Sequence, residues 1–393
     1  MKYSVFNLFI LVLASANCYV NIKTVYEWNY LNYTWENKDQ MEKAKSSGNY
    51  DPYKCVLYDV AKADDGRIFV TIPKEMGNGV PATLATISNI PNPKGQPLNP
   101  YPNWGWHNST WDKKPACDRI INVNRINIAC DHLFVMDNGK VEDKKLCVPK
   151  LLIFRLKDNE LIKTINISND IANNKAGIGL LVTPMIYVPK GCSRFLDEMI
   201  VFIADMKGYG LIVYDASTNR TCRVESDYMK PSDKNFSLGN QSFTYDYGIF
   251  SMTPFCNDLY FSAVSSKEIY KIKIKKLLEC PGKQEANNHT KLAIKIPSQT
   301  GQVTTVGHSI IYNDSKGTSL MGTNVCNKSD NKTVVLAKND ELIRILSAIK
   351  PWRDYILLVE DNFQDFILSQ VNFNNTLFRI MEVKVSEIRK EME

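Results

Sequence analysis

The segment IACDHLFVMDNG, residues 128–139, decides between two interpretations of this chain. Cys130, Asp131 and His132 stand together, as metal ligands or catalytic groups would. The same segment also has the form of a β-strand, because the apolar residues 133–136 lie between two polar turns. A strand belonging to a regular architecture predicts that the pattern recurs along the chain, so we searched for further copies.

The pattern of the opening segment recurs five times. Each copy begins with a polar turn, continues with a short apolar or alternating run, and ends in a second turn that is often followed by a second strand. The copies are DDGRIFVTIP (64–73), LDEMIVFIADMKGYGLIVYD (196–215), NDLYFSAVSSKEIYKIKI (257–274), KGTSLMGTN (316–324) and WRDYILLVEDNFQDFILSQVN (352–372). Runs rich in Ile, Val, Phe and Tyr between turn residues predict strands. Strong helical patterns are few, and VSEIRKEME (385–393) is the clearest.

The spacing of these copies predicts how many structural repeats the chain contains. The marker residues Gly66, Asp131, Asp197, Asn257, Gly317 and Arg353 are separated by 65, 66, 60, 60 and 36 residues. A repeat of about 60 residues that holds several short strands is typical of propeller blades, and radial closure protects the sheet edges. We therefore predict an all-β, six-bladed β-propeller whose last, short blade is completed by an N-terminal strand. A pair of β-sandwiches is the alternative.

In a propeller, the opening segment is an inner strand, HLFVMD, that ends in an Asn-Gly turn. His132 then begins a strand, and Cys130 becomes a disulfide partner for another blade. This interpretation removes the main argument for a metal or catalytic cluster at residues 128–139.

The N-terminus has the features of a secretory signal peptide over residues 1–18. Lys2 precedes an apolar run too short to cross a bilayer, and Ala14 and Ala16 supply the small residues of a cleavage site. We therefore predict a secreted protein without a membrane segment, with residues 19–393 forming a single propeller domain. Eleven Asn-x-Ser/Thr sequons between Asn32 and Asn374 are candidate glycosylation sites.

Nine cysteines follow Cys18, and this odd number predicts at least one unpaired thiol. Disulfides are expected in a secreted chain. The pairs Cys130–Cys192 and Cys256–Cys326 each join segments one repeat apart, so we predict these two bridges first.

Net charge and histidine content argue against several classes of function. The charge of +6 is mild and spread along the chain, and the Lys-rich run KEIYKIKIKKLLE (267–279) is a strand with one solvated face. We expect no nucleic-acid binding, although polyanions at a cell surface stay open. The four histidines form no HExxH motif, and GxSxG, P-loop and dinucleotide motifs are absent from the sequence. We therefore expect no metal, no cofactor and no enzymatic activity.

The strand segments resemble those of the yellow / major royal jelly protein family of insects. The segments INVNRINIACDHLFVMDNG, CVPKLLIFRL, VFIADMKGYGLIVYD, YGIFSMTP and VNFNNTLFRI carry the resemblance, which extends from about residue 50 to about residue 385. The chain is most similar to the yellow-related salivary proteins of blood-feeding sand flies. The resemblance implies a six-bladed propeller with a small-ligand site in its central channel.

In the salivary branch, the implied ligand is a biogenic amine: serotonin, noradrenaline, adrenaline, dopamine or histamine. Sequestering these amines counters host haemostasis and inflammation. In the pigmentation branch, the implied alternative is an enzyme that converts dopachrome or a related catechol derivative. A closed propeller needs no partner, so a monomer is expected.

The resemblance also implies ligand-binding residues. In VEDNFQDF (359–366), Asn362 matches the Asn of the family's Ser-Asn pair, Asp361 replaces the Ser, and Phe363 follows. Ser347 occupies the position of a hydroxyl that faces the ligand in the salivary proteins. An aromatic ammonium needs hydrogen-bond acceptors and a π-face, which these side chains offer. Thr323, Tyr247 and Phe250, at comparable positions of two other blades, complete the expected site.

Overall fold

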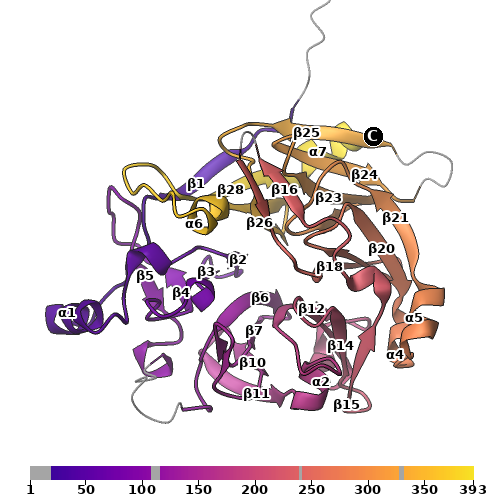
Figure 1. Ribbon diagram of the computed structural model, residues 1–393, viewed down its shortest axis with the longest axis horizontal. Helices are drawn as coiled ribbons and strands as arrows, with labels where there is room; N and C mark the ends of the chain where they lie inside the picture. The colour runs from indigo at the N-terminus through magenta and orange to yellow at the C-terminus, as the bar shows by residue number, and fades with distance from the viewer. Residues whose placement is uncertain (1–18, 108–115, 239–240, 327–331) are drawn as a thin grey trace, which may run out of the picture.

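The computed structural model describes residues 19–393, except 108–115, 239–240 and 327–331. The predicted signal peptide, residues 1–18, lies outside the described residues. Six four-stranded antiparallel sheets surround a central axis (Figure 1), so the predicted six-bladed β-propeller is confirmed.

The first three blades follow one another along the chain. Blade 1 contains β2 (Asp59–Lys62), β3 (Ile68–Thr71), β4 (Leu84–Ile87) and β5 (Leu98–Pro100). Blade 2 contains β6 (Val123–Ala129), β7 (His132–Asp137), β10 (Lys150–Arg155) and β11 (Glu160–Asn166). Blade 3 contains β12 (Leu181–Tyr187), β13 (Ile200–Asp205), β14 (Gly210–Asp215) and β15 (Arg220–Glu225). The first strand of each blade lies next to the central axis.

The last three blades include the closure of the ring. Blade 4 contains β18 (Ile249–Phe255), β19 (Asp258–Ala263), β20 (Glu268–Lys273) and β21 (Lys291–Lys295). Blade 5 contains β22 (Thr304–Val306), β23 (Ser309–Asp314), β24 (Ser319–Asn324) and β25 (Thr333–Lys338). Blade 6 contains β26 (Leu346–Trp352), β27 (Tyr355–Glu360), β28 (Phe378–Lys384) and, as its outermost strand, β1 (Lys23–Trp28). The prediction that an N-terminal strand completes the last blade is thus confirmed.

Two small hairpins and short helices decorate the propeller. The hairpins are β8 (Lys140–Val141) with β9 (Lys144–Lys145) and β16 (Asn235–Leu238) with β17 (Gln241–Thr244). The helices are α1 (Lys38–Ser46), α2 (Asn169–Ala172), α3 (Phe195–Glu198), α4 (Ile274–Leu278), α5 (Lys283–His289), α6 (Phe363–Ile367) and α7 (Val385–Met392). Within the described part of the chain, no helix has the length and apolarity needed to cross a membrane.

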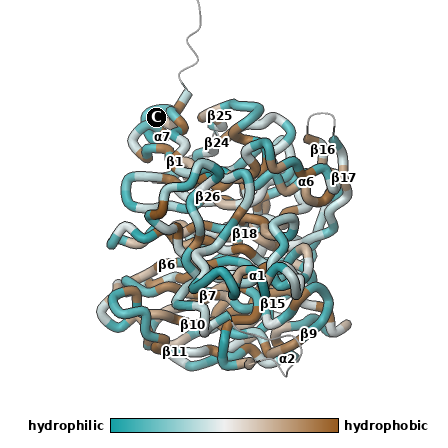
Figure 2. The backbone as a smooth tube through the Cα atoms, turned by 90° about the vertical axis from the view of Figure 1, so that its left-hand side faces the viewer, coloured by the Kyte–Doolittle hydropathy of each residue, from teal (hydrophilic) through white to brown (hydrophobic). Residues whose placement is uncertain are grey.

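The hydrophobic core lies between the blades. One cluster joins blades 2 and 3 through Phe134, Ile153, Val201 and Ile212. A second cluster, which includes Trp28, joins blade 1 to blade 6. Strands near the axis are buried on both faces, whereas outer strands such as β15 keep exposed positions. Apolar segments therefore run through the interior of the molecule, and polar segments dominate its loops (Figure 2).

The opening segment is a pair of blade strands, as predicted. His132 begins β7, and its ring packs on Phe195 with 4.5 Å between centroids. The sequence placed this strand in the inner part of the blade, and the structure makes it second from the axis, after β6. The strand ends at Asp137, directly before Asn138 and Gly139, and these two residues lead into the β8–β9 hairpin rather than into the next blade strand. The Asp137 carboxylate accepts from the Gly139 amide at 3.0 Å and fixes this exit from β7.

One repeat marker was assigned to the wrong turn. Five markers lie between the first and second strands of their blades, but Gly317 lies between the second and third strands of blade 5. The equivalent turn contains Gly307, which is 50 residues after Asn257 and 46 before Arg353. Tight turns of this kind need a positive φ, and Gly307 has a φ of 56°. The repeat is therefore less regular than the sequence spacing indicated.

Three disulfides are present among the described residues: Cys117–Cys147, Cys130–Cys192 and Cys222–Cys280. The predicted bridge between Cys130 and Cys192 is confirmed and joins blade 2 to blade 3. The predicted bridge between Cys256 and Cys326 is wrong, because both are free, exposed thiols. The Cys326 sulfur lies 3.4 Å from Nδ1 of His308 and also contacts the Cys256 thiol, without a bond between the two sulfurs.

Candidate functional site

A small cavity of about 40 Å³ lies on the propeller axis, at the ends where the inner strands begin. Inner strands of blades 2, 4 and 6 contribute to it, together with loops and the start of α6. Its walls are Tyr58, Arg125, Met206, Tyr245, Phe250, Val264, Gly301, Ile345, Ser347, Asp361 and Phe363. We call this space the axial cavity. Of the six side chains predicted as ligand-binding, the structure brings Ser347, Phe363 and Phe250 together here.

Aromatic rings form much of the wall of the axial cavity. The Tyr58 ring meets Phe250 and Phe363 edge-on, with centroids 6.4 and 6.3 Å apart. Tyr245 meets Phe363 in the same way at 5.7 Å. Aromatic rings in the wall of a cavity can hold another ring or a cation.

Two polar groups of the wall are buried close together. The hydroxyl oxygen of Ser347 and the Oδ2 atom of Asp361 have no partner of normal hydrogen-bond geometry, although the Ser347 hydroxyl lies near enough to lower the pKa of Asp361. The other Asp361 oxygen, Oδ1, accepts from the Phe363 amide at 3.2 Å. Burial raises the pKa of Asp361 to about 7, against the lowering effects of the Phe363 amide, the Ser347 hydroxyl and the Arg125 charge. An unpaired buried carboxylate is costly, and a cationic donor would relieve that cost.

Three charged side chains close the axial cavity on the side toward the middle of the propeller. The Asp59 carboxylate contacts NH1 of Arg125 at 3.1 Å and Nζ of Lys350 at 3.0 Å. NH2 of Arg125 also donates to the Ser347 carbonyl at 2.6 Å, and its guanidinium lies 4.2 Å from the Phe250 centroid. We call Asp59, Arg125 and Lys350 the channel plug. The plug holds one positive charge in excess, since one carboxylate faces two cationic groups.

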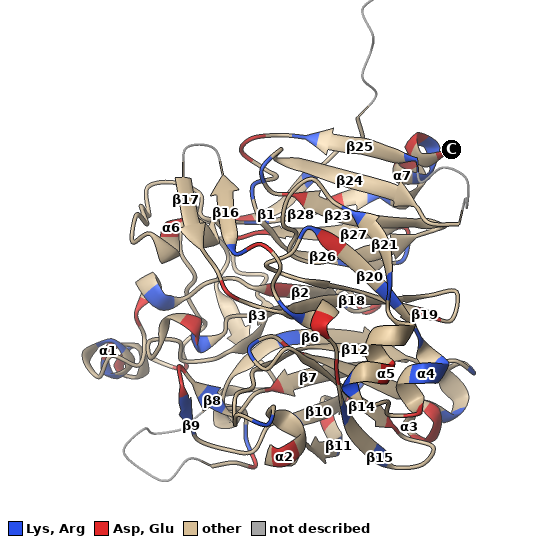
Figure 3. Cartoon of the chain, turned by 45° about the vertical axis from the view of Figure 1, so that its right-hand side comes forward, with Lys and Arg blue, Asp and Glu red and all other residues tan. Residues whose placement is uncertain are grey.

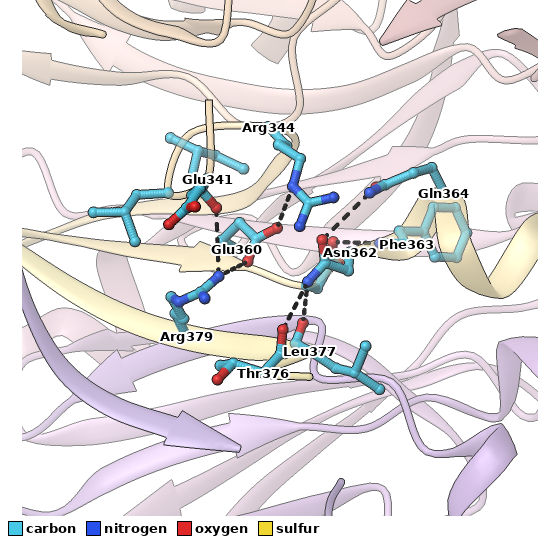
Figure 4. Close-up of polar contacts among 12 residues, drawn as sticks. Glu341, Arg344, Glu360, Asn362, Phe363, Gln364, Thr376, Leu377 and Arg379 are labelled. Atoms are coloured by element: carbon cyan, nitrogen blue, oxygen red, sulfur yellow. Dashed lines mark hydrogen bonds and ion pairs between the residues drawn. The ribbon is translucent and has the colours of Figure 1, made fainter. Parts of the chain in front are cut away.

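Asn362 does not line the axial cavity, and its side chain is bonded to Thr376, Leu377 and Gln364 (Figure 4). Its Nδ2 donates to the carbonyls of Thr376 and Leu377 at 3.3 and 3.0 Å, and its Oδ1 accepts from Gln364 at 3.3 Å. Its φ of 45° is left-handed, a conformation that Asn tolerates better than most residues. Asn362 thereby fixes the turn between β27 and α6 and positions its neighbours Asp361 and Phe363.

Glu360, at the end of β27, belongs to a separate ionic cluster. Its carboxylate contacts Arg379 at 3.2 Å and Arg344 at 3.7 Å (Figure 4). Burial raises the pKa of Glu360 to about 8, although both arginines lower it. This cluster anchors the strand end from which Asp361 projects.

The remaining two predicted residues lie outside the axial cavity. Thr323, in β24, shares hydrogen bonds with the hydroxyls of Tyr312 at 3.1 Å and Thr333 at 2.9 Å. Tyr247 lines a cleft of about 460 Å³ together with Tyr245, whose ring also forms a wall of the axial cavity. Tyr245 therefore separates the axial cavity from this cleft, which we call the entrance cleft.

Sequence reasoning missed Asp361, Arg125, Tyr58 and Tyr245 as wall residues. Asp361 could have been found, because it replaces a hydroxyl residue beside Asn362 in the segment that was singled out. Arg125 lies in β6, where most of the other residues are apolar. An Arg in such a strand indicates a buried charge that needs a partner. No signal marked Tyr58 or Tyr245, since tyrosines at strand ends are common in this chain.

No described group of three or more His, Cys, Asp or Glu side chains has the arrangement to hold a metal ion. His107 is buried, its Nε2 donates to the Tyr101 carbonyl at 2.9 Å, and burial lowers its pKa to about 4. Positive and negative side chains are interspersed over the molecule (Figure 3).

The fold and the axial cavity define a class: a six-bladed propeller with an axial site of aromatic and acidic groups. The chain belongs to the major royal jelly protein family, whose model matches residues 121–392. Major royal jelly protein 8 of Apis mellifera is 30% identical over 401 residues, covering 96% of this chain and 93% of the relative. Major royal jelly protein 9 of the same species is 29% identical, covering 92% and 88%.

A PQQ-bound aldose sugar dehydrogenase from Streptomyces coelicolor is similar in structure, with a TM-score of 0.47, 11% identity, and coverage of 93% of this chain and 98% of that one. This likeness is too distant to carry an argument about function.

Proposed function

We propose that the protein is a non-catalytic binding protein that sequesters biogenic amines in the axial cavity. The observation that carries the proposal is the buried pair of Asp361 Oδ2 and the Ser347 hydroxyl, neither with a hydrogen-bond partner of normal geometry, inside an aromatic wall. A ligand ammonium would donate to both oxygens, and its ring would stack among Phe250, Phe363 and Tyr245. The resemblance to salivary proteins, with the signal-peptide features of residues 1–18, supports a secreted, salivary role.

Asp361 takes the role that the sequence assigned to Asn362. An ionised carboxylate attracts an ammonium more strongly than an amide does, because both partners are charged. Asn362, whose amide is bonded to Thr376 and Leu377, supports the site through the turn geometry. Tyr247 lines the entrance cleft, through which the amine would pass. Thr323 is hydrogen-bonded within blade 5 and has no part in the site.

The axial cavity must widen to admit an aromatic amine. About 40 Å³ holds roughly three water molecules, whereas serotonin has about a dozen heavy atoms. Phe363 lies on the short helix α6, and Tyr245 follows the β16–β17 hairpin, so both walls are borne by small elements rather than by blade strands. We propose that these two rings move apart to open the axial cavity toward the entrance cleft.

The affinity follows from the size of the ligand. At about −0.7 to −0.9 kcal/mol per heavy atom, a biogenic amine binds with about −8 to −11 kcal/mol. This range corresponds to a Kd between about micromolar and about 10 nM. A protein that removes one amine per chain needs an affinity of this order.

Calorimetry with serotonin tests the proposal. The expected result is saturable heat with one site per chain and serotonin recovered unchanged. Phe363→Leu should weaken binding by about 2- to 12-fold through loss of the ring contact. Phe366→Leu is the matched control, since Phe366 is a buried ring of the same helix that does not line the axial cavity.

The alternative, conversion of dopachrome or a related catechol derivative, has its own signature. An excess of dopachrome over protein would lose its absorbance with multiple turnovers. That result, or serotonin binding that Phe363→Leu and Phe366→Leu affect equally, would contradict the proposal.

A further inference from the structure

A second cavity of about 610 Å³ opens at the opposite end of the propeller axis. The inner strands of all six blades contribute residues from their middle or final parts, such as Met252 of β18, Ile349 of β26, and Ala61 and Lys62 of β2. Because these strands begin at the axial cavity and end here, the two cavities lie at the two ends of one channel. We call this second space the funnel.

The channel plug divides the funnel from the axial cavity. Lys350 lines the funnel, Arg125 lines the axial cavity, and Asp59 contacts both of them. Nζ of Lys350 also donates to the Ile126 carbonyl at 2.7 Å, which fixes the ammonium at this level. A molecule in the funnel therefore has no open path to Asp361, and the two ends can be occupied independently.

The funnel wall is divided between apolar surface and hydrogen-bond donors. Its apolar side chains include Met185, Met252 and Ile349. The indole of Trp352 is also part of the wall, its Nε1 is buried without a partner, and Nζ of Lys62 lies 3.8 Å from its ring centroid. Pockets of several hundred Å³ that combine apolar walls with a few placed polar groups are typical of small-molecule sites.

The charges around the funnel favour an anion at its inner end. Near the mouth, Lys62 pairs with Glu382 at 3.0 Å and Arg353 pairs with Asp64 at 2.8 Å, and the exposed Asp131 adds one negative charge, so the mouth carries no positive excess. At the inner end, the channel plug carries one positive charge in excess. The Lys350 ammonium has three N–H groups and two partners in the described structure, Asp59 and Ile126, which leaves one donor for a ligand.

We propose that the funnel binds an amphipathic carboxylate, with its acid group at Lys350 and its apolar body along Met185, Met252 and Trp352. The apolar wall and the positive charge at Lys350 together define this class of ligand. An apolar amine would be repelled by that charge. A small inorganic anion would not cover the apolar wall, which would stay exposed to water. This site is separate from the proposed amine site and does not depend on it.

Calorimetry with three ligands of equal chain length tests the head-group preference: decanoate, decanol and decylammonium. We expect saturable binding of decanoate at one site per chain. Decanol should bind about tenfold or more weakly, because it lacks the charged hydrogen bond to Lys350, and decylammonium should bind more weakly still. Equal binding of decanoate and decanol would overturn the assignment of an anion site.

A substitution that fills the funnel locates the binding. Thr305 is a half-buried wall residue of blade 5, so Thr305→Trp should abolish decanoate binding. Thr221, half-buried on the outer strand β15, gives the matched control Thr221→Trp, which should bind decanoate like the parent. Both variants should keep the parent's melting temperature within a few degrees and bind serotonin alike.

Parent-like decanoate binding by Thr305→Trp, or displacement of decanoate by serotonin, would overturn the proposal. The second result would place decanoate in the axial cavity. Absence of serotonin binding with decanoate binding intact would contradict the amine proposal and leave the funnel proposal standing.

Discussion

Replacing Asp361 by Asn tests the role of its carboxylate most directly. The two side chains have nearly the same shape, so the substitution removes the charge and leaves the wall of the axial cavity in place. A hydrogen bond to a charged group contributes about 1.5–3 kcal/mol, so serotonin affinity should fall about 10- to 150-fold. Asp365→Asn is the control, because it makes the same charge change on α6 outside the axial cavity.

The pKa of Asp361 adds a pH dependence to this prediction. With a pKa of about 7, the carboxyl is half ionised at pH 7. If only the ionised form binds an ammonium, serotonin affinity should be about tenfold weaker at pH 6 than at pH 8. The Asp361→Asn variant should show no such change over the same range.

As pH rises, the free energy of unfolding should fall while the affinity for serotonin increases. Burial raises the pKa of Asp361 above its unfolded value, so the folded state holds more protons between about pH 4 and pH 7, and stability falls as pH rises through that window. About 3 pKa units correspond to at most about 4 kcal/mol at pH 8. Asp361→Asn should therefore melt at a higher temperature than the parent at pH 8, with the gain disappearing near pH 4.

Calorimetry at pH 6, 7 and 8 and thermal melts of parent, Asp361→Asn and Asp365→Asn measure all three effects. Parent-like serotonin affinity in Asp361→Asn would refute the role of the carboxylate. Equal affinity of the parent at pH 6 and pH 8 would refute the assigned titration.

Three further predictions follow from local geometry. Asn362→Ala should lower the free energy of unfolding by about 2–4 kcal/mol, because two side-chain hydrogen bonds are lost and Ala disfavours a positive φ. Denaturant melts measure this change. A large loss of serotonin affinity at unchanged stability would instead place Asn362 in the binding site. Iodoacetamide should label Cys256 and Cys326 in the native, unreduced protein, because both thiols are exposed. It should label the buried Cys55 only after the protein is unfolded. Peptide mapping that finds Cys256 or Cys326 unlabelled in the native protein would contradict the structure. Cys130→Ser with Cys192→Ser should destabilise by about 4 kcal/mol in the chain-entropy model, and an unchanged melting temperature would show that blades 2 and 3 pack as well without the bridge.

The fold could be predicted because each blade repeats one local pattern. Turns such as the one at Asp131 and strands such as 132–137 are visible in the sequence, since they follow from apolar alternation and turn chemistry. The error at Gly317 arose because blade 5 has short turns at both ends of β23, and sequence spacing cannot say which of two similar turns closes the first hairpin.

The site was harder to predict for a physical reason. The axial cavity gathers residues from positions as far apart as Tyr58 and Phe363, and no local pattern encodes such convergence. Asn362 was identified by residue type, but a buried Asn satisfies its amide with whichever carbonyls its turn presents, here Thr376 and Leu377. Asp361 was overlooked because its importance depends on being buried without a partner, which only the packed structure reveals.

The pairing of β1 with β28 sets an order of events for a chain made from its N-terminus. Lys23 lies opposite Glu382 in this ladder, so the first strand to be synthesised must wait for nearly the last one before it finds its place. Until then, β1 is an unpaired edge that other strands could capture. A chain shortened at its C-terminus would thus lose more than its last residues: the ring would stay open, and both cavities on its axis would lose the wall that blade 6 supplies.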